Sequence, residues 1–520
     1  MTSRVGMRRF AAASLLAMAA LLGGCVTNPV TGDRELGLVS EGQERQIGDQ
    51  QFSPSRQMQG GDYVVDPDLT RYVKEVGGRV AAVSDRPLDY DFEVINSSVP
   101  NAWALPGGKI AINRGLLYEL QSEAELAAVL GHEVVHAAAR HGAQRMERGL
   151  LLQGAMVATA IATHDSDYGQ YALGGAQIAA ALVSTRYGRD AELESDRYGM
   201  VYMKRAGYDV EGAVDLQETF VRLSEGRRSD WLSGLFASHP PSAARVEANR
   251  RTAAELGPGG RRGEEDYRRA TARLRETREA YQRFDEGRKA LSDGDPDEAR
   301  RLAEAAIRIE GREAQFYGLK GDVSFAQRNY RAAIGHYGEA IERNPGYFKF
   351  FLGRGESNRR LGNLNAAEED IAASVRLLPT ADAVAALGQI AEAQKDYETA
   401  IRYYEKAASS RTPAGRTATS RLLALDLPKR PDRYVAVGRR VDQSGRVYFE
   451  VGNRTAVSLR DVQVQFAYRD NAGQVRRESR RLRGPIQPRQ SIVLMLGTSY
   501  APFYDTIEAR AAGAAPATDG

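Results

Sequence analysis

Apolar and polar side chains alternate along the C-terminal part of the chain. The clearest run places Val462, Val464, Phe466 and Tyr468 in alternation with Gln463, Gln465 and Ala467. This period of two is that of a β-strand with one buried face. Residues 448–451 and 492–495 are predicted to add further strands, and residues 470–473 to form a turn. We therefore expect a small β-sandwich over residues 433–511, which serves as a docking or spacer module, and a disordered tail over residues 512–520.

A repeat of 34 residues precedes the predicted sheet region. Small residues recur at fixed offsets, with Gly287, Gly321 and Gly355 spaced by 34, Gly388 after a further 33, and Ala299, Ala333, Ala367 and Ala400 in step with them. Such residues allow the two helices of a hairpin to approach closely, and the period resembles that of tetratricopeptide repeats. Four units over residues 281–410 would stack into an α-solenoid whose concave face binds a partner. A non-repetitive helical bundle is the alternative.

Glycine-rich segments and the ends of the repeat suggest where the domains meet. Residues 257–263 contain four glycines, so we expect a linker and a lead-in helix over residues 257–280. A second linker is expected over residues 411–432. A chain of 520 residues suggests about three or four domains. The expected fold is multidomain and mainly α, with a separate domain over residues 26–256.

His132, Glu133 and His136 form the most informative motif in the chain. On a helix the two histidines lie on one face, close enough to bind one metal ion. Zinc prefers imidazole nitrogen, and Glu133 is placed to take a proton from a water molecule activated by the metal. A solvated helix face is the alternative. His141 is nine residues from His132 and falls on the opposite side of a continuous helix, so we interpret it with Arg140 as a packing or solvated pair.

Acidic residues further along the chain are candidates for the third ligand. Glu192 and Asp196 are four residues apart and therefore share a helical face. We take Glu192 as the ligand and Asp196 as the group that orients a metal-binding histidine through its second ring nitrogen. The alternative is an acidic, solvated helix face, which is the interpretation that we apply to Glu194.

Five motifs carry a family resemblance. They are residues 28–32, residues 101–108, the stretch from His132 to His136, the stretch from Glu192 to Asp196, and residues 238–242 together with Arg245. Over about residues 26–250 the chain resembles the zinc metallopeptidases of the CAAX-prenyl-protease type, especially their soluble periplasmic BepA-like branch. The resemblance implies an α+β zincin-like metalloprotease domain and endopeptidase activity with one Zn²⁺ per chain. It also implies His132, His136 and Glu192 as ligands and Glu133 as general base. Ser195 departs from the alanine that usually precedes the aspartate.

Three further features bear on the site. His239 precedes two prolines and therefore lies on a stiff loop, from which it could approach the open zinc position and either steady the transition state or cap the metal. Arg245 is a candidate for stabilising the developing oxyanion. Residues 110–113 are predicted to form a short strand. It is either an edge strand that pairs with an extended substrate or an ordinary core strand, and the sequence leaves both open.

The N-terminus indicates where the protein works. Three arginines within the first nine residues precede an apolar run over residues 10–22, which is typical of a secretory signal and short for a membrane span. The run ends in a stretch that resembles the bacterial lipoprotein processing box. Its Cys25 is the only cysteine in the chain and is the expected lipidation site. Val26 lacks the acidic character linked to inner-membrane retention, so we expect an outer-membrane anchor facing the periplasm. A plain cleaved signal is the alternative.

Taken with the resemblance, these patterns predict a lipid-anchored periplasmic zinc metalloendopeptidase. Its expected role is quality control of outer-membrane or envelope proteins, with the repeats recruiting protein substrates or outer-membrane assembly machinery. The net charge of +3 on 520 residues offers no reason to expect nucleic acid as a partner. The alternative function is a chaperone or assembly scaffold whose metal site is mostly capped.

Overall fold

The computed structural model describes residues 25–153, 187–226, 239–444, 446–495 and 505–517. The chain divides into two compact units, Met1–Pro379 and Thr380–Gly520. The predicted signal segment lies outside the described residues, and only the backbone of Cys25 lies within them, in a short hairpin of β1 (Cys25–Thr27) and β2 (Arg34–Leu36). Among the described residues, no helix combines the length and apolarity that crossing a bilayer would require.

A three-stranded mixed sheet lies at the centre of the N-terminal domain. Its order is β3 (Asp91–Ile95), β5 (Lys109–Asn113) and β4 (Ala102–Leu105), with β5 parallel to β3 and antiparallel to β4. The predicted strand over residues 110–113 is therefore the central strand. The edge-strand interpretation is wrong, and the core-strand alternative is confirmed by the buried side chains of Ile110 and Ile112.

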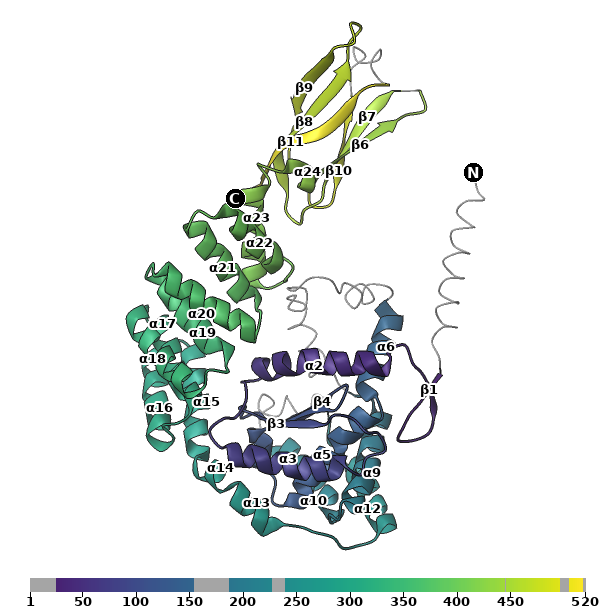
Figure 1. The fold of residues 1–520 in the computed structure, drawn as a ribbon, viewed down its shortest axis with the longest axis vertical. Coiled ribbons are helices and arrows are strands. Elements are labelled where there is room, and N and C mark those ends of the chain that lie inside the picture. Colours follow the sequence, from purple (N-terminus) through teal and green to yellow (C-terminus); the bar gives the residue numbers. More distant parts are fainter. Residues whose placement is uncertain (1–24, 154–186, 227–238, 445, 496–504, 518–520) are drawn as a thin grey trace. The chain divides into compact units, whose positions relative to one another are not determined.

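Helices cover both faces of this sheet (Figure 1). Phe52 of α2 packs with Trp103 on one face, while α3 and α5 contact the other. The helices that follow residue 187 extend this second layer, whereas Met146 packs with Phe52 and Trp103 on the first face. The helices are α2 (Glu41–Met58), α3 (Pro67–Ala81), α4 (Arg114–Leu117), α5 (Glu123–Ala138), α6 (His141–Gln153), α9 (Arg189–Arg205), α10 (Glu211–Gly226) and α12 (Ala243–Leu256).

Helices α5 and α9 approach each other through two glycines. A Cβ atom on Gly199 would lie 3.0 Å from the backbone nitrogen of His132, and one on Gly131 would lie 3.1 Å from the carbonyl oxygen of Gly199. Every side chain of α5 is buried, and Ser122 caps its N-terminus by accepting a hydrogen bond from the backbone N–H of Glu125. The helix is therefore held in the interior, with its middle turn directly against α9.

The glycine-rich segment that begins at Gly257 is fastened to this domain by backbone hydrogen bonds. The carbonyl of Arg262 accepts from Ala124, and the N–H of Arg261 donates to the carbonyl of Gly207. The short helices α13 (Glu264–Ala270) and α14 (Ala272–Glu276) then lead to the repeats. This part of the predicted linker is therefore held against the domain by backbone hydrogen bonds.

Paired helices follow α14 in the first unit. They are α15 (Arg278–Ser292), α16 (Pro296–Ile309), α17 (Ala314–Ala326), α18 (Tyr330–Arg343), α19 (Phe348–Arg360) and α20 (Leu364–Leu377). The repeated glycines lie where helices meet, since a Cβ on Gly321 would fall 2.6 Å from the ring of Tyr337 and one on Gly355 would fall 2.5 Å from Ile371. The periodic small residues therefore permit close helix pairing, as the sequence predicted.

The second unit begins with helices and ends in strands. Its helices are α21 (Ala381–Ala393), α22 (Tyr397–Ala407), α23 (Pro413–Asp426) and α24 (Pro431–Tyr434). The expected linker over residues 411–432 is therefore mostly helical. It is also packed, because Leu423 and Leu427 belong to the same apolar core as the strands.

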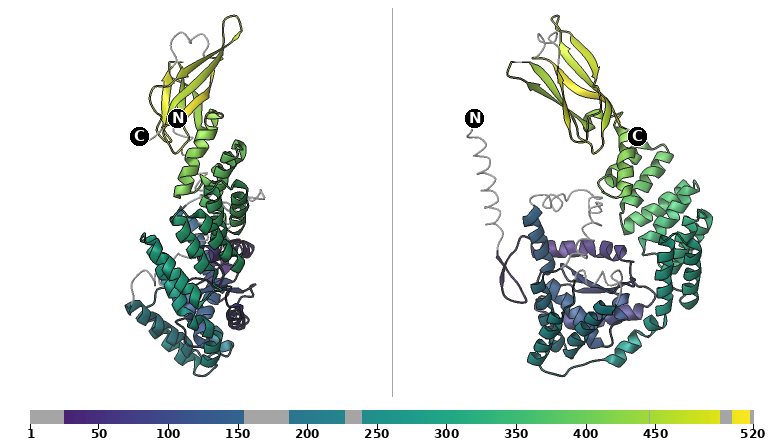
Figure 2. Two further views of the ribbon diagram at one scale, coloured as in Figure 1. Left: turned by 90° about the vertical axis from the view of Figure 1, so that its left-hand side faces the viewer. Right: turned by 180° about the vertical axis from the view of Figure 1, so that it is seen from behind.

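Two three-stranded antiparallel sheets complete the second unit (Figure 2). One has the order β10 (Ser491–Met495), β7 (Val447–Asn453) and β6 (Val435–Val441). The other has the order β11 (Glu508–Pro516), β8 (Leu459–Arg469) and β9 (Val475–Arg481). Phe449 and Phe466 meet between the sheets, with ring centroids 5.5 Å apart. The predicted disordered tail is wrong for residues 513–516, because Gly513, Ala515 and Pro516 pair with β8.

Candidate metal centre

Two histidines of α5 and one glutamate of α9 converge in the interior of the N-terminal domain. The Nε2 atoms of His132 and His136 lie 3.0 Å apart, as their spacing of one helical turn predicts. The carboxylate of Glu192 lies 3.6 Å from Nε2 of His132 and 3.5 Å from Nε2 of His136. Ligand atoms held about 2.0 Å from a tetrahedral zinc ion are about 3.3 Å apart. The three predicted ligands therefore have the spacing that zinc requires.

A fourth nitrogen joins this cluster from the loop before α12. Nδ1 of His239 lies 2.9 Å from Oε1 of Glu192 and 3.3 Å from Nε2 of His132. One donor atom from each of the four residues falls within 4.8 Å of all the others, and all four side chains are buried. The structure thus brings His239 to the position that the sequence analysis offered for it.

Asp196 lies one turn beyond Glu192 on α9 and contacts the ring nitrogen of His132 that faces away from the cluster. Its Oδ1 atom is 3.0 Å from Nδ1 of His132, which leaves Nε2 facing the cluster. The side chain of Arg245 donates to both oxygens of Asp196 at 2.7 Å. Burial raises the pKa of Asp196, but the Arg245 guanidinium outweighs it and holds the pKa below its ordinary value. Asp196 is therefore an ionised acceptor for the imidazole N–H.

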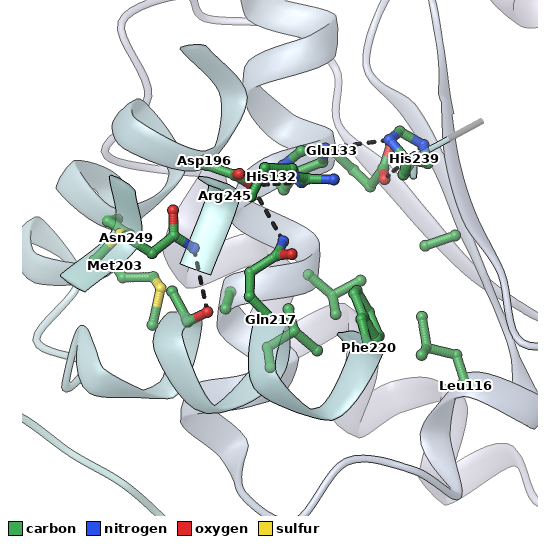
Figure 3. Close-up of a pocket in the computed structure, with 16 residues that line it drawn as sticks. Leu116, His132, Glu133, Asp196, Met203, Gln217, Phe220, His239, Arg245 and Asn249 are labelled. Atoms are coloured by element: carbon green, nitrogen blue, oxygen red, sulfur yellow. Dashed lines mark hydrogen bonds and ion pairs between the residues drawn. The ribbon is translucent and has the colours of Figure 1, made fainter. Parts of the chain in front are cut away.

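The guanidinium of Arg245 is fully engaged by neighbouring oxygens. Nη1 lies 2.9 Å from Oε2 of Glu192 and 3.3 Å from the carbonyl oxygen of Pro240, while Nε and Nη2 contact Asp196. The group thus bridges the two carboxylates of α9. Figure 3 shows its contact with Asp196.

His141 contacts the back of the second histidine, which the sequence analysis did not foresee. Its Nδ1 lies 2.8 Å from Nδ1 of His136, and its Nε2 lies 3.4 Å from Oε1 of Glu194. Glu194 in turn accepts a hydrogen bond from the side-chain amide of Asn28 at 3.2 Å. The solvated interpretation of Glu194 is therefore wrong, because its carboxylate completes a chain of contacts that ends at His136.

The backbone at Arg140 explains why His141 was misplaced on the helical wheel. Helix α5 ends at Ala138, and Arg140 adopts a left-handed φ of 62°, so the chain turns before α6 begins. His141 and Arg140 are both buried, and Arg140 donates to the side chain of Glu44 and the carbonyl of Val39. Of the two interpretations of this pair, packing is confirmed and solvation is wrong. The ring of Tyr187 also stacks on His136, with centroids 3.9 Å apart.

Burial and charge set the protonation of the cluster in the metal-free chain. Burial lowers the pKa of His136 well below its ordinary value, which favours the neutral imidazole that binds metal. Burial alone would raise the pKa of Glu192. The charge of His239 and the hydrogen bonds from His136 and His239 outweigh burial, so the pKa of Glu192 is lowered. Burial raises the pKa of Glu133, whose Oε2 atom has no hydrogen-bond partner in the described part of the chain.

An apolar pocket lies beside Glu133 and the histidines. Leu116, Met203 and Phe220 contribute apolar side chains, and Gln217 and Asn249 contribute polar ones (Figure 3). Glu133 reaches from α5 toward His239, and its Oε1 atom lies 3.6 Å from Nε2 of that residue. The unpartnered carboxylate oxygen thus belongs to a residue that lines a cavity next to four potential metal ligands.

Comparison with known proteins agrees with this geometry. Residues 67–253 match the family model of Peptidase family M48. Residues 67–253 therefore form an M48 peptidase domain. Three overlapping stretches, residues 284–348, 319–382 and 352–416, match the model of the tetratricopeptide repeat, so the predicted repeats are confirmed.

Individual relatives cover different parts of this M48 peptidase. The beta-barrel assembly-enhancing protease of Escherichia coli (strain K12) is 27% identical over 357 residues, which span 61% of this chain and 71% of that protein. The mitochondrial metalloendopeptidase OMA1 of Schizosaccharomyces pombe is 35% identical over 183 residues, which span 34% of this chain and 51% of that protein. The solved structure of the first TPR of Spaghetti (RPAP3) bound to an HSP90 peptide is 21% identical. It covers 23% of this chain and 95% of its own, with a TM-score of 0.23.

Proposed function

We propose that this M48 metallopeptidase is a zinc endopeptidase that holds one Zn²⁺ per chain through His132, His136 and Glu192. The observation that carries the proposal is the tetrahedral spacing of their donor atoms, with an acidic or imidazole partner behind each histidine. When bound, zinc supplies Lewis-acid polarisation of a peptide carbonyl and of the attacking water.

Glu133 is the proposed general base. Its carboxylate accepts the proton of the attacking water and later delivers it to the leaving amine, so that no net proton is consumed in the two transfers. The free Oε2 atom and the raised pKa support this role, because a more basic carboxylate accepts a proton more readily. The adjacent apolar pocket would hold the neighbouring substrate side chain and exclude water.

The surrounding polar groups are proposed to position the ligands. Asp196 accepts a hydrogen bond from the Nδ1–H of His132, and Nδ1 of His141, whose Nε2 faces Glu194, accepts one from the Nδ1–H of His136. These bonds fix the tautomer that leaves Nε2 of each ligand free. Arg245 holds Asp196 and Glu192 together. Its contacts favour this positioning role over the oxyanion contact that the sequence analysis considered, since each of its nitrogen atoms already meets an oxygen.

The proposed place of action is the periplasmic face of the outer membrane, with the protein anchored through lipid on Cys25. The apolar run at residues 10–22 and the processing-box resemblance support it. The proposed role is quality control of outer-membrane or envelope proteins, with the repeats recruiting substrate or assembly machinery. The name of the Escherichia coli relative, a beta-barrel assembly-enhancing protease, supports a link to outer-membrane assembly.

A chaperone or assembly scaffold with a capped metal site is the second candidate. It is favoured by His239, whose Nδ1 occupies the position of a fourth ligand and would leave no open place for substrate. Both candidates share the same zinc site, and they differ in whether proton transfer through Glu133 is needed for the cellular task.

The test uses Glu133→Gln with Glu342→Gln, an exposed position on the repeats, as matched control. Purified chain is incubated with an unfolded outer-membrane protein, and the same variants are tested for rescue of a deletion strain. We expect Glu133→Gln to keep its zinc, to lose at least about a hundredfold in cleavage rate and to fail in the cell. Full rescue by that variant would favour the scaffold, and unchanged cleavage would remove Glu133 from the reaction.

His239→Ala separates the two proposed states of the site. If His239 caps the zinc, its removal should speed cleavage while zinc content stays at one per chain. His336→Ala, which removes a half-buried histidine of the repeats, is the control. A variant that cleaves more slowly would instead assign His239 to the transition state, and an unchanged rate and zinc content would exclude it from the site.

A further inference from the structure

The C-terminal strands carry a charge that the rest of the chain does not. Residues 433–517 contain fourteen arginines, no lysine and seven aspartates or glutamates, for a net charge of +7. The whole chain has a net charge of only +3, so the remaining residues carry −4. A concentrated field of one sign points to a partner of the opposite sign.

The arginines are densest on strand β9 and the turn after it. Residues 475–483 hold five arginines and one glutamate, and six of the seven residues of β9 are exposed. Strand β9 is an edge of its sheet. Charged residues on an edge strand oppose aggregation. That protection does not depend on the sign of the charge, so it does not explain why five of the six charged residues here are arginines.

The strand register places two arginines of β9 and one of β11 on the outward face of the sheet. Val464 and Phe466 of β8 point into the core, so Gln463, Gln465 and Ala467 point outward. Paired residues share a face, and the partners of these three include Arg481 and Arg477 on β9 and Arg510 on β11. In the described part of the chain, neither Arg477 nor the nearby exposed Arg483 has an ion pair or hydrogen bond through its side chain. On this face Arg481 pairs with Asp461 and Arg510 donates to Gln465, whereas Arg477 on the face and Arg483 just beyond the strand carry guanidinium groups that are open to an external anion.

Exposed aliphatic side chains accompany the arginines. Nine large apolar residues of the described chain are exposed, and four of them lie on these strands: Val441 (51%), Val475 (49%), Val493 (58%) and Met495 (48%). Val475 is two residues from Arg477 and shares its face. Val493 and Met495 alternate with the core-facing Ile492 and Leu494, so they point outward from the other sheet. Arg480 donates to the carbonyl oxygen of Met495 at 3.2 Å, so the edge strands β9 and β10 lie side by side at one rim of the two sheets.

We propose that β9 and the adjoining outer sheet face bind the surface of a phospholipid bilayer that carries anionic head groups. Guanidinium groups form bidentate hydrogen bonds with phosphate oxygens, and the aliphatic side chains enter the head-group region. A bilayer fits better than an acidic polypeptide because exposed aliphatic side chains lie beside the arginines, with Val475 on β9 itself and Val493 and Met495 on the neighbouring edge strand β10. This contact is independent of zinc chemistry and adds a second membrane attachment to the lipid on Cys25 in the proposed function.

The test measures vesicle binding by the chain from residue 25 onward with Cys25→Ser, which lacks acyl groups and keeps every described segment. Vesicles contain either phosphatidylglycerol mixed with phosphatidylcholine or phosphatidylcholine alone. The double variant Arg477→Glu/Arg483→Glu is compared with Arg331→Glu/Arg411→Glu, which changes the net charge equally at two exposed arginines near helix N-termini. Far-ultraviolet circular dichroism and peptidase activity check that each variant is folded.

We expect binding to anionic vesicles only, weakened by salt, with a partition coefficient that falls at least about thirtyfold in the β9 variant and stays near wild type in the control. Each basic residue near an anionic surface contributes a factor of about five, so the loss of two gives that magnitude. Equal loss in both variants, equal binding to both vesicle types, or the absence of binding would each overturn the proposal. Binding to polyglutamate in place of vesicles would assign the surface to an acidic polypeptide.

Discussion

Replacement of His141 by alanine tests how the second metal ligand is held in position. Nδ1 of His141 and Nδ1 of His136 lie 2.8 Å apart, and both rings are buried, with 4% and 1% of their surface exposed. To bind zinc through Nε2, His136 must carry its proton on Nδ1. Without His141 that N–H has no acceptor, and a buried unsatisfied donor costs about 1 to 3 kcal/mol. We therefore expect the Kd for zinc to rise about tenfold to hundredfold.

The assay is competition for zinc between the demetallated chain and a chromogenic chelator at neutral pH. His141→Asn is the rescue variant, because its side-chain oxygen can accept the same hydrogen bond, and it should recover most of the affinity. His336→Ala controls for the loss of a histidine elsewhere. If His141→Ala bound zinc as tightly as the wild type, the chain from Glu194 through His141 to His136 would have no role in holding the ligand.

Three other substitutions, one of them with a matched control, test the site and the repeats. Glu192→Gln should lose its zinc, and retention of one zinc per chain by elemental analysis would refute the ligand assignment. Arg245→Met leaves two buried carboxylates without their cation, so the metal-free chain should lose about 3 to 5 kcal/mol of stability in urea; an unchanged midpoint would exclude this bridge. Gly321→Ala places a methyl group 2.6 Å from the ring of Tyr337 and should cost about 1 to 3 kcal/mol. Gly335→Ala meets nothing within 4 Å and should gain up to about 1 kcal/mol, so equal effects would contradict the packing argument.

Features that depend on residues close together in the chain were predictable. His132 and His136 share a face because four residues make about one helical turn, and the same reasoning pairs Glu192 with Asp196. The repeats were predictable for a related reason, since each glycine meets the next helix of its own hairpin. The alternation of apolar and polar residues along β7, β8 and β10 likewise predicts strands with one buried face, because it depends only on neighbouring residues.

Features set by turns and by distant partners escaped the same reasoning. The position of His141 was predicted for a helix that continues from His132 through His141. The helix instead ends before Arg140, which has a left-handed backbone conformation. Strand β11 has almost no alternation of its own, and its pairing with β8 is a contact between segments about 45 residues apart. A strand of small residues is stabilised by that pairing more than by its own side chains.

The sequence by itself determined the chemistry of this protein, because the residue types and their helical spacing specify a pair of imidazoles, a base and a carboxylate. Only the tertiary structure decided how that chemistry is held. The bridge from Arg245 to α9, the contact from Asn28 through Glu194 to His141 and the approach of His239 all join segments separated by many residues. Such contacts leave no periodic trace in the chain, since they depend on how buried helices pack and on the need of each buried polar group for a partner.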